Sequence, residues 1–360
     1  MGFSSVSLFP LSSSSLVTST SLATTSPTTD EASTWKPKIS SLEDRKNLRN
    51  SSSQQERIET ETIGSIGFHH VEFYCGDARS MANQFAISLG MSVTGITGQS
   101  TGNDQCISYG LQSGDRFRLL LTAPYSRARA TRDDGDDNNN TEEYDAPMPL
   151  PNYNVEEAHI FFQKHGLAAR AIGIEVIDAK KAFEASVANG AIPVLEPTFL
   201  PTCPAQLKTR RINGDDGISK SKEEDGCYIS EVELYGDVVL RYVSFISSNN
   251  ENNINIDDDA AQPFLPHLAP VIDESRSRTD SSKDDNDDDG FGIYRIDHAV
   301  GNVPNLQEVY SHIKKFTGFH EFAEFTSADV GTIDSGLNSV VLASDSEEVL
   351  LPLNEPTNGR

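Results

Sequence analysis

The chain has 360 residues, enough for two domains of ordinary size, but only 36% of them are hydrophobic. Part of the sequence is therefore expected to lie outside any packed core. The formal net charge of −25 argues against binding to nucleic acids, whose phosphate backbone requires a basic surface. Much of the acidic charge is concentrated in three runs typical of solvated loops, at 133–137, 257–259 and 284–289.

The first 64 residues are interpreted as a tail and lead-in that precede the folded part. Residues 1–29 are rich in Ser and Thr and contain no acidic residue. This composition resembles a plastid transit peptide, although the usual arginines are missing, and a disordered tail of a cytosolic protein is the alternative. The localisation, cytoplasm or plastid, therefore stays open at this point.

The cysteines and the apolar runs bear on the compartment. Cys75, Cys106, Cys203 and Cys227 show no CxxC spacing, which favours a reduced, intracellular chain. No apolar run approaches the roughly 18 to 20 residues needed to span a bilayer. We therefore expect neither a membrane nor a nucleic acid among the partners.

Residues 65–246 carry the patterns of a first domain. Alternation of apolar and polar residues predicts strands, whereas apolar spacings of three and four predict helices. The expected strands span 66–75, 106–111, 116–122, 168–176, 228–235 and 238–246. The expected helices span 78–89, 155–165 and 179–188. Polar inserts at about 127–151 and 202–226 interrupt this domain.

A second domain follows a long acidic stretch. Residues 247–290 are Asn-rich and of low complexity, and we interpret them as an interdomain linker. Ordered sequence resumes in a C-terminal domain over 291–360. Its expected elements are a strand over 294–303, a helix over 306–316 and strands over 319–326, 337–343 and 349–353.

One unit, a strand, an amphipathic helix and further antiparallel strands, recurs along the chain. It begins near Ile66, Ala168 and Arg295, and residues 68–72 (FHHVE) correspond to residues 296–300 (IDHAV). Such a unit exposes an apolar sheet face, so we expect units to pair around a shared pocket. The sequence therefore predicts an α+β fold with two modules in the first domain and only one in the second.

His298 is the residue of greatest chemical interest. The alternation in 294–303 predicts a strand with Ile296, His298 and Val300 on its inner face. An inward histidine is either a packed, hydrogen-bonded core residue or a metal ligand. The pattern alone does not decide between these two interpretations.

Several long segments, in collinear order, resemble plant-type 4-hydroxyphenylpyruvate dioxygenases. They are 68–73 (FHHVEF), 122–126 (TAPYS), 187–191 (VANGA), 234–243 (LYGDVVLRYV), 297–304 (DHAVGNVP), 316–320 (FTGFH), 334–339 (DSGLNS) and 350–356 (LLPLNEP). The similarity runs from about Ile66 to Arg360. It implies the vicinal oxygen chelate fold, which is built of paired βαβββ modules.

The resemblance also implies a metal site. Members of this family hold Fe(II) on two His and one Glu, which leaves positions open for an α-keto acid and for O₂. It implies that His298 is one ligand, and it puts Ser339 and Asn354 near the substrate; without it, both would be read as ordinary polar residues of a sheet. His69 and His70 occupy the matching position of the first module, where the family carries no metal, so a structural role is expected for them.

The activity implied is conversion of 4-hydroxyphenylpyruvate and O₂ to homogentisate and CO₂, a step of tyrosine catabolism. A related type, hydroxymandelate synthase, uses the same ligands with a different outcome. The family's second His and its Glu ligand are expected beyond Arg360, so the chain is predicted to be truncated and inactive as given. The alternative is a non-catalytic paralogue or fragment that binds a full-length partner, and a homodimer stays open.

Overall fold

A computed structural model describes residues 62–125, 150–202, 226–246, 264–271, 291–325 and 336–356. The possible transit segment, most of both polar inserts and most of the linker lie outside these residues. No helix in the described ranges is long and apolar enough to cross a membrane.

The first module begins with β1 (Ser65–Tyr74), followed by α2 (Ala78–Leu89). The side chain of Asp77 accepts a hydrogen bond from the backbone N–H of Ser80 and so caps the start of α2, which ends at Gly90 in the left-handed conformation, φ 64°. The remaining elements are β2 (Ser92–Thr97), the short 3₁₀ helix η1 (Gln99–Thr101), β3 (Cys106–Ser113) and β4 (Phe117–Pro124). β4 returns to pair with β1 in parallel.

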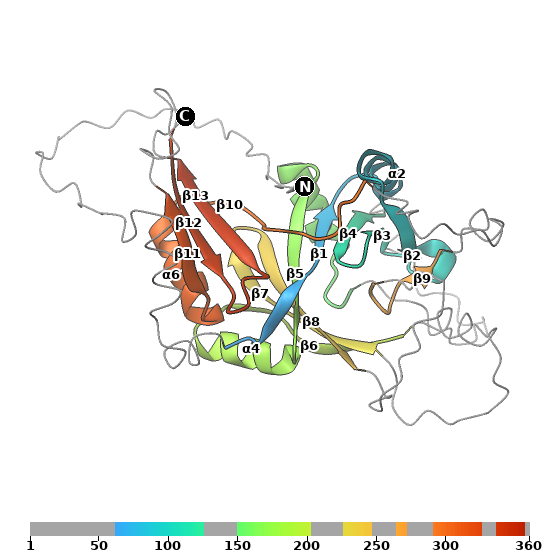
Figure 1. Ribbon diagram of the computed structural model, residues 1–360. Coiled ribbons are helices and arrows are strands. Elements are labelled where there is room, and N and C mark those ends of the chain that lie inside the picture. Colours follow the sequence, from blue (N-terminus) through green and yellow to red (C-terminus); the bar gives the residue numbers. More distant parts are fainter. Residues whose placement is uncertain are drawn as a thin grey trace, which may run out of the picture.

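The second module repeats this plan. It follows α3 (Val155–His165) and consists of β5 (Ala168–Val176), α4 (Ala179–Ala188), β6 (Pro193–Pro201), β7 (Gly226–Tyr235) and β8 (Val238–Ile246). β8 pairs with β5 in parallel, and β5 pairs with β1 in antiparallel fashion. Within the described residues this joins both modules in one nine-stranded sheet, in the order β6-β7-β8-β5-β1-β4-β3-β2-β9 (Figure 1).

Residues 264–271 pack onto this sheet although they fall inside the range that composition assigns to a linker. Phe264, Leu265 and Leu268 are buried, and β9 (Ala269–Pro270) pairs with β2. The three apolar side chains belong to a second core cluster with residues of β4, β6, β7 and β8. Burial of these three apolar side chains stabilises the packed segment, and the acidic composition of the flanking sequence gave no indication of it.

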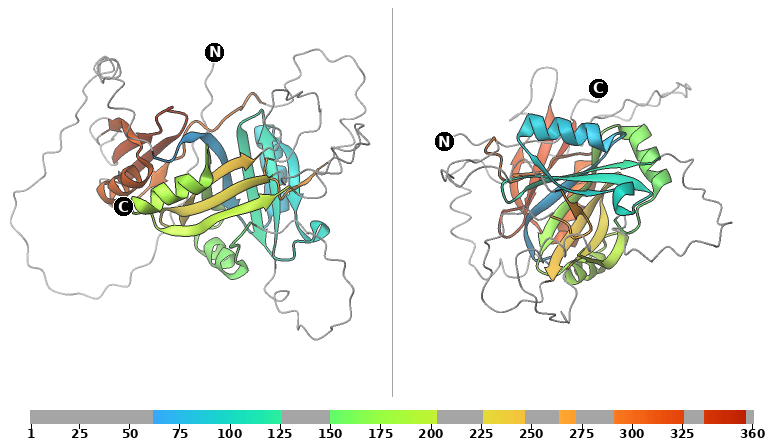
Figure 2. Two further views of the ribbon diagram at one scale, coloured as in Figure 1. Left: turned by 90° about the horizontal axis from the view of Figure 1, so that it is seen from below. Right: turned by 90° about the vertical axis from the view of Figure 1, so that its right-hand side faces the viewer.

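The third module lies beside the first two (Figures 1 and 2). Its elements are β10 (Gly301–Asn302), α6 (Leu306–Thr317), β11 (His320–Phe325), β12 (Leu337–Ala343) and β13 (Leu350–Pro356). They form a separate sheet in the order β10-β13-β12-β11, with β10 parallel to β13. α6 packs on one face of this sheet and contacts α4 of the second module.

The module joins the N-terminal domain through a continuous core. Buried residues of both parts, among them Ile313, Phe316 and Leu353, belong to one hydrophobic cluster. At the junction, a Cβ on Gly301 would lie 2.6 Å from the ring of Tyr235 at the end of β7. Only a glycine at position 301 allows this close approach.

The predicted α+β fold of βαβββ modules is confirmed, as are the three predicted helices of the first domain. The predicted strand over 294–303 is largely wrong. Only Gly301–Asn302 forms a strand there, and Arg295 and His298 make single bridges, to Arg116 and Leu350. On either side of His298, Ile296 and Ala299 are buried, so the spacing there is three rather than the expected two, and His298 does not share a buried face with Ile296.

Candidate functional site

His298 lies where the chain enters the third module. It bridges Leu350 at the start of β13, and the backbone N–H of Ala299 donates to the carbonyl of Leu350 at 3.1 Å. Along β13, Leu351 and Leu353 face the core, whereas Leu350 lies on the half-exposed face of the sheet. Because bridged residues point to the same side, His298 lies on this half-exposed face, opposite α6, and 22% of its side chain is exposed.

The imidazole of His298 is held by the residue before it. Nδ1 of His298 lies 2.9 Å from Oδ2 of Asp297. A carboxylate only accepts, so Nδ1 carries a proton; in a neutral ring the lone pair is then on Nε2. A carboxylate bound to the far nitrogen of a histidine is the arrangement that orients metal-ligating histidines.

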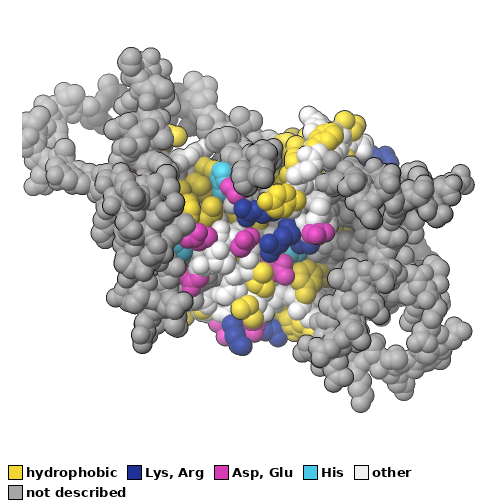
Figure 3. Space-filling model, viewed as in Figure 1, with side chains coloured by type: hydrophobic (Ala, Val, Ile, Leu, Met, Phe, Trp, Pro, Cys, Tyr) yellow, Lys and Arg dark blue, Asp and Glu magenta, His cyan; other side chains and the backbone are white. Residues whose placement is uncertain are grey.

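Asp297 is itself fixed by a short chain of charges. Its Oδ1 lies 3.2 Å from Nη2 of Arg295, whose Nη1 lies 3.5 Å from Glu348. Glu348 also pairs with Arg116 of the first module at 3.4 Å. Figure 3 shows basic and acidic side chains gathered together on this view of the molecule. The chain of ion pairs ties the orientation of Asp297 to the junction between the two sheets.

Ser339 and Asn354 lie opposite each other on the paired strands β12 and β13. The hydroxyl of Ser339 donates to Oδ1 of Asn354 at 2.7 Å, and Nδ2 of Asn354 donates to Oδ1 of Asn302 at 3.4 Å. The three polar side chains thus form one group across β12, β13 and β10. The structure brings together the two residues that the sequence predicted to lie near a substrate.

His298 is on the same sheet as this group but does not touch it. Its bridge partner Leu350 is four residues before Asn354 on β13, which corresponds to about 13 Å along a strand. Both positions belong to the half-exposed face. The face therefore carries an imidazole near one end and an amide–hydroxyl pair near the other.

The donor set can be compared with what iron requires. His298, with Nδ1 held by Asp297, fits one ligand position. Across the described ranges, however, no three His, Cys, Asp or Glu side chains lie close enough together to hold a metal ion. The described residues fit one position of an Fe(II) site and not a complete one.

His69 and His70 lie in a different environment, inside the N-terminal domain. Both are fully buried, and their Nδ1 atoms are 2.7 Å apart. Nε2 of His70 lies 2.9 Å from Nη1 of Arg241, which also forms ion pairs with Glu72 at 2.6 Å and Glu231 at 2.7 Å. Burial, followed by the charges around it, holds the pKa of each histidine well below 6.5, so both rings are neutral.

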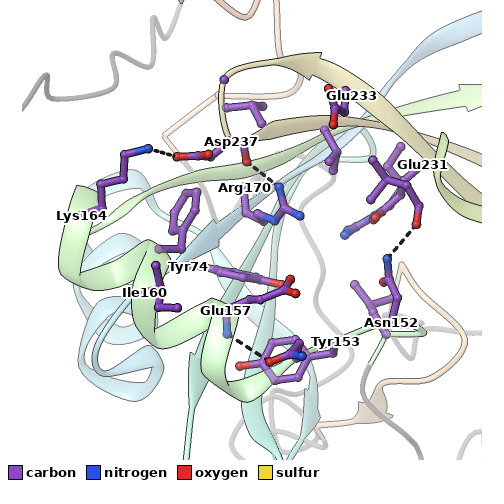
Figure 4. A pocket seen from close by; sticks show the side chains of 18 residues that line it. Tyr74, Asn152, Tyr153, Glu157, Ile160, Lys164, Arg170, Glu231, Glu233 and Asp237 are labelled. Carbon is purple, nitrogen blue, oxygen red and sulfur yellow. Dashed lines mark hydrogen bonds and ion pairs between the residues drawn. The ribbon is translucent and has the colours of Figure 1, made fainter. Parts of the chain in front are cut away.

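A cavity of about 600 Å³ opens beside this cluster, in the N-terminal domain rather than at His298. Figure 4 shows that its walls come from α3, β5 and β7, and that Lys164, Arg170 and Glu231 are among the side chains that line it. Lys164 pairs with Asp237 at 2.6 Å. His298, the predicted ligand, is not among the residues that line this cavity.

Sequence reasoning missed the residues that support the site. Asp297 entered only as the first residue of the segment 297–304, and Arg295 and Asn302 were given no role. The usable signal was the acidic residue directly before a candidate ligand. Arg241 within an otherwise apolar strand was a second signal, since a buried arginine requires acidic partners.

Comparison with known proteins shows what the chain is similar to. The chain is 42% identical over 292 residues to a 4-hydroxyphenylpyruvate dioxygenase of Arabidopsis thaliana, covering 81% of this chain and 54% of that protein. A second protein of that name, from Daucus carota, is also 42% identical over 292 residues, covering 81% of this chain and 53% of the relative. The predicted resemblance to plant 4-hydroxyphenylpyruvate dioxygenases is confirmed.

The chain spans about half the length of the curated dioxygenases that it matches. No family model matches it. Among solved structures, a mutant 4-hydroxymandelate synthase from Streptomyces coelicolor superposes with a TM-score of 0.50 at 14% identity, covering 82% of this chain and 64% of the other. This likeness concerns the fold alone. The predicted fold of paired modules of the vicinal oxygen chelate type is confirmed.

Proposed function

We propose that the chain serves as a 4-hydroxyphenylpyruvate dioxygenase, which converts 4-hydroxyphenylpyruvate and O₂ to homogentisate and CO₂. The observation that carries the proposal is the orientation of His298 by Asp297 on the open face of the third module. The 42% identity to plant enzymes of that name supports the assignment. The longer relatives are named for this activity, and the activity, its substrates and the Fe(II) ion are proposed here for this chain.

In this proposal His298 is one ligand of an Fe(II) ion, and Fe(II), when bound, supplies the O₂ chemistry that side chains lack. Asp297 keeps the proton on Nδ1 and the lone pair on Nε2 of His298. Ser339 and Asn354 offer a hydroxyl and an amide to a polar group of the substrate. Arg295 positions Asp297 through the ion pair at 3.2 Å.

The test measures product directly. The purified chain is given Fe(II), ascorbate and 4-hydroxyphenylpyruvate, while homogentisate is followed by chromatography and O₂ consumption by an electrode. The described residues offer one position of an Fe(II) site, and the sequence predicts an inactive chain, so the assay decides first whether homogentisate forms at all. For any turnover we expect one O₂ consumed per homogentisate, and a rate at least about 100-fold lower for His298→Ala, because a metal site depends on each ligand. Ser339→Ala is expected to raise KM more than it lowers kcat. Homogentisate formation that survives His298→Ala would contradict the role of His298.

A second function has an observation in its favour. Within the described residues the sheet face that carries His298 is half-exposed and Leu337 is 38% exposed, and the metal ligands there are incomplete. A non-catalytic chain that binds a full-length relative through this face is the alternative. If the purified chain forms no homogentisate but co-elutes with the Arabidopsis thaliana relative in size-exclusion chromatography, the alternative replaces the first proposal. A substitution of Leu337 by Lys is then expected to abolish co-elution.

A further inference from the structure

The first and third modules correspond residue by residue in their opening halves. α2 and α6 are both 12 residues long. Each begins after an N-cap whose side chain accepts a backbone N–H, Asp77 and Asn305, and each ends at a left-handed glycine, Gly90 and Gly318. Counting back by equal steps from the two N-caps pairs His70 with His298. It also pairs His69 with Asp297.

The two histidines are held in the same way. In each module, Nδ1 is bound by the side chain of the preceding residue, by His69 at 2.7 Å and by Asp297 at 2.9 Å. Because a guanidinium only donates, Nε2 of His70 must accept from Arg241, and the neutral ring then carries its proton on Nδ1. His70 and His298 therefore have the same tautomer, with the lone pair on Nε2.

The polar pairs of the two modules correspond as well. Ser108 and Thr122 are register partners on β3 and β4, with their hydroxyl oxygens 2.9 Å apart. Ser339 and Asn354 are register partners on β12 and β13 and are also hydrogen-bonded. The first module thus contains buried counterparts of His298 and of the hydrogen-bonded pair Ser339 and Asn354.

Nε2 of His70 accepts a hydrogen bond from a cationic side chain, Arg241. Within the sheet, His70 pairs with Gly173 of β5, and Gly173 pairs with Arg241 of β8, so the three residues form one row. A Cβ on Gly173 would lie 2.5 Å from Nδ1 of His70, which explains why the middle position is a glycine. The guanidinium of Arg241 reaches across the glycine and meets His70, Glu72 and Glu231 at 2.9 Å, 2.6 Å and 2.7 Å.

We propose that the guanidinium of Arg241 stands where a divalent metal ion would bind at this buried counterpart of His298, and that removing it opens a cation site made of His70, Glu72 and Glu231. One imidazole and two carboxylates are a donor set that divalent transition metals accept. A guanidinium spreads its charge over three nitrogens, so the three acceptors surround it at separate points instead of converging on one atom. With Arg241 in place the described residues therefore form no group of three metal ligands here, and the site requires removal of the guanidinium. The comparison with His298 rests on the proposed function, whereas the geometry around Arg241 does not.

The experiment is made in a His298→Ala background, so that binding at the third module does not enter. Arg241→Ala is titrated with Co²⁺, followed by visible absorption, and thermal unfolding is recorded with Co²⁺, with methylguanidinium and with Na⁺ at equal ionic strength. The matched control is Arg170→Ala, because Arg170 lines the same cavity and donates to the backbone carbonyl of Asp237.

We expect Arg241→Ala to lower Tm by about 10 °C, since it leaves two buried carboxylates without their cation. Co²⁺ and methylguanidinium are each expected to restore at least half of this loss, and Na⁺ none. One equivalent of Co²⁺ should show ligand-field bands in Arg241→Ala and in neither the background protein nor Arg170→Ala. Adding Glu231→Gln should weaken Co²⁺ binding at least tenfold.

If Arg241→Ala does not fold by itself, it is refolded in the presence of Co²⁺ or methylguanidinium, and recovery of the folded state supports the proposal. Failure of both cations to restore stability or folding overturns it. Failure of Co²⁺ alone, with rescue by methylguanidinium, overturns the metal site and reduces Arg241 to a structural ion pair. None of these outcomes depends on whether the chain forms homogentisate.

Discussion

His70 and His298 hold the same position in two related modules, yet their surroundings differ in one decisive respect. His70 is fully buried, closed in by β5, β8 and the segment 264–271, whereas 22% of the His298 side chain is exposed. We call the buried cluster around His70 the closed copy and the site around His298 the open copy. In the closed copy, the cationic side chain of Arg241 donates a hydrogen bond to His70. The open copy, His298, lies on the half-exposed face of its sheet with Nδ1 held by Asp297. Enclosure by a second module, more than the local sequence, decides what each histidine can bind.

The largest expected effect concerns the closed copy. Replacing Glu231 by Leu leaves Arg241 with half of its buried carboxylate partners, and breaking a buried pair typically costs about 3–5 kcal/mol. Glu233→Leu, two residues away on the same strand and exposed, is the control and should stay within about 0.5 kcal/mol. Urea unfolding measures both. Equal losses in the two variants would show that the buried cluster contributes nothing special.

A pH dependence should come next in size. Burial lowers the pKa of His69, His70 and His267 below 6.5, in the case of His267 to about 3. These rings stay neutral in the folded protein but protonate in the unfolded chain below pH 6.5, so stability is present above that pH and falls below it. Between pH 7 and pH 5.5 each should cost about 1 kcal/mol of the free energy of unfolding.

Urea unfolding at pH 7.5, 6.5 and 5.5 measures this slope. His267→Gln should remove about a third of it, because one of three depressed groups is lost. A free energy of unfolding that stays constant down to pH 5.5 would mean that these histidines protonate as readily in the folded protein as in the unfolded chain. Burial would then not distinguish His70 from His298.

The junction between the two copies offers a third test. The residue that corresponds to Gly301 in the first module is Phe73, whose ring packs 6.0 Å from that of Phe85. In the third module the ring of Tyr235 takes that space, so Gly301→Ala should cost about 1–3 kcal/mol by overpacking. In a Tyr235→Leu background the same substitution should cost less. An equal cost in both backgrounds would remove Tyr235 as the cause.

The smallest effect should come from Asp297→Asn in the open copy. An amide holds Nδ1–H less firmly than a carboxylate does, and loss of such a partner typically weakens a metal site 10- to 100-fold. We expect at least a tenfold lower affinity of the chain for Co²⁺, measured by the shift of the His298 ring signals in NMR. Asp345→Asn, a half-exposed acid elsewhere in the module, is the control. Unchanged Co²⁺ affinity in Asp297→Asn would show that Asp297 does not orient His298 for metal binding.

Much of the fold follows from local patterns. The predicted helices agree with α2, α3 and α4 because capping residues such as Asp178 and helix-ending residues such as Gly90 mark their ends. The strand β6 was missed because it contains three prolines, which the sheet accepts only since β6 lies at its edge. β2 was missed as well, and its pairing with β3 contains an irregularity beside Gly95.

The site could be predicted only in part. His298, Ser339 and Asn354 came from the resemblance, and the structure joins the last two by a hydrogen bond. The roles of Asp297 and Arg241 depend on which strands become neighbours. Glu72 and Arg241 are 169 residues apart in sequence, and no local pattern brings them together. The substrate and ligand roles themselves remain proposals.

The segment 264–271 has a consequence for where the N-terminal domain can be cut. Phe264 lies against the rings of both His69 and His70, and His267 is buried beside them. A protein shortened to end at Ile246 would keep all strands from β1 to β8 and still uncover this histidine pair to water. The smallest autonomous unit of the domain therefore extends to Val271. An N-terminal domain expressed by itself should end no earlier than this residue.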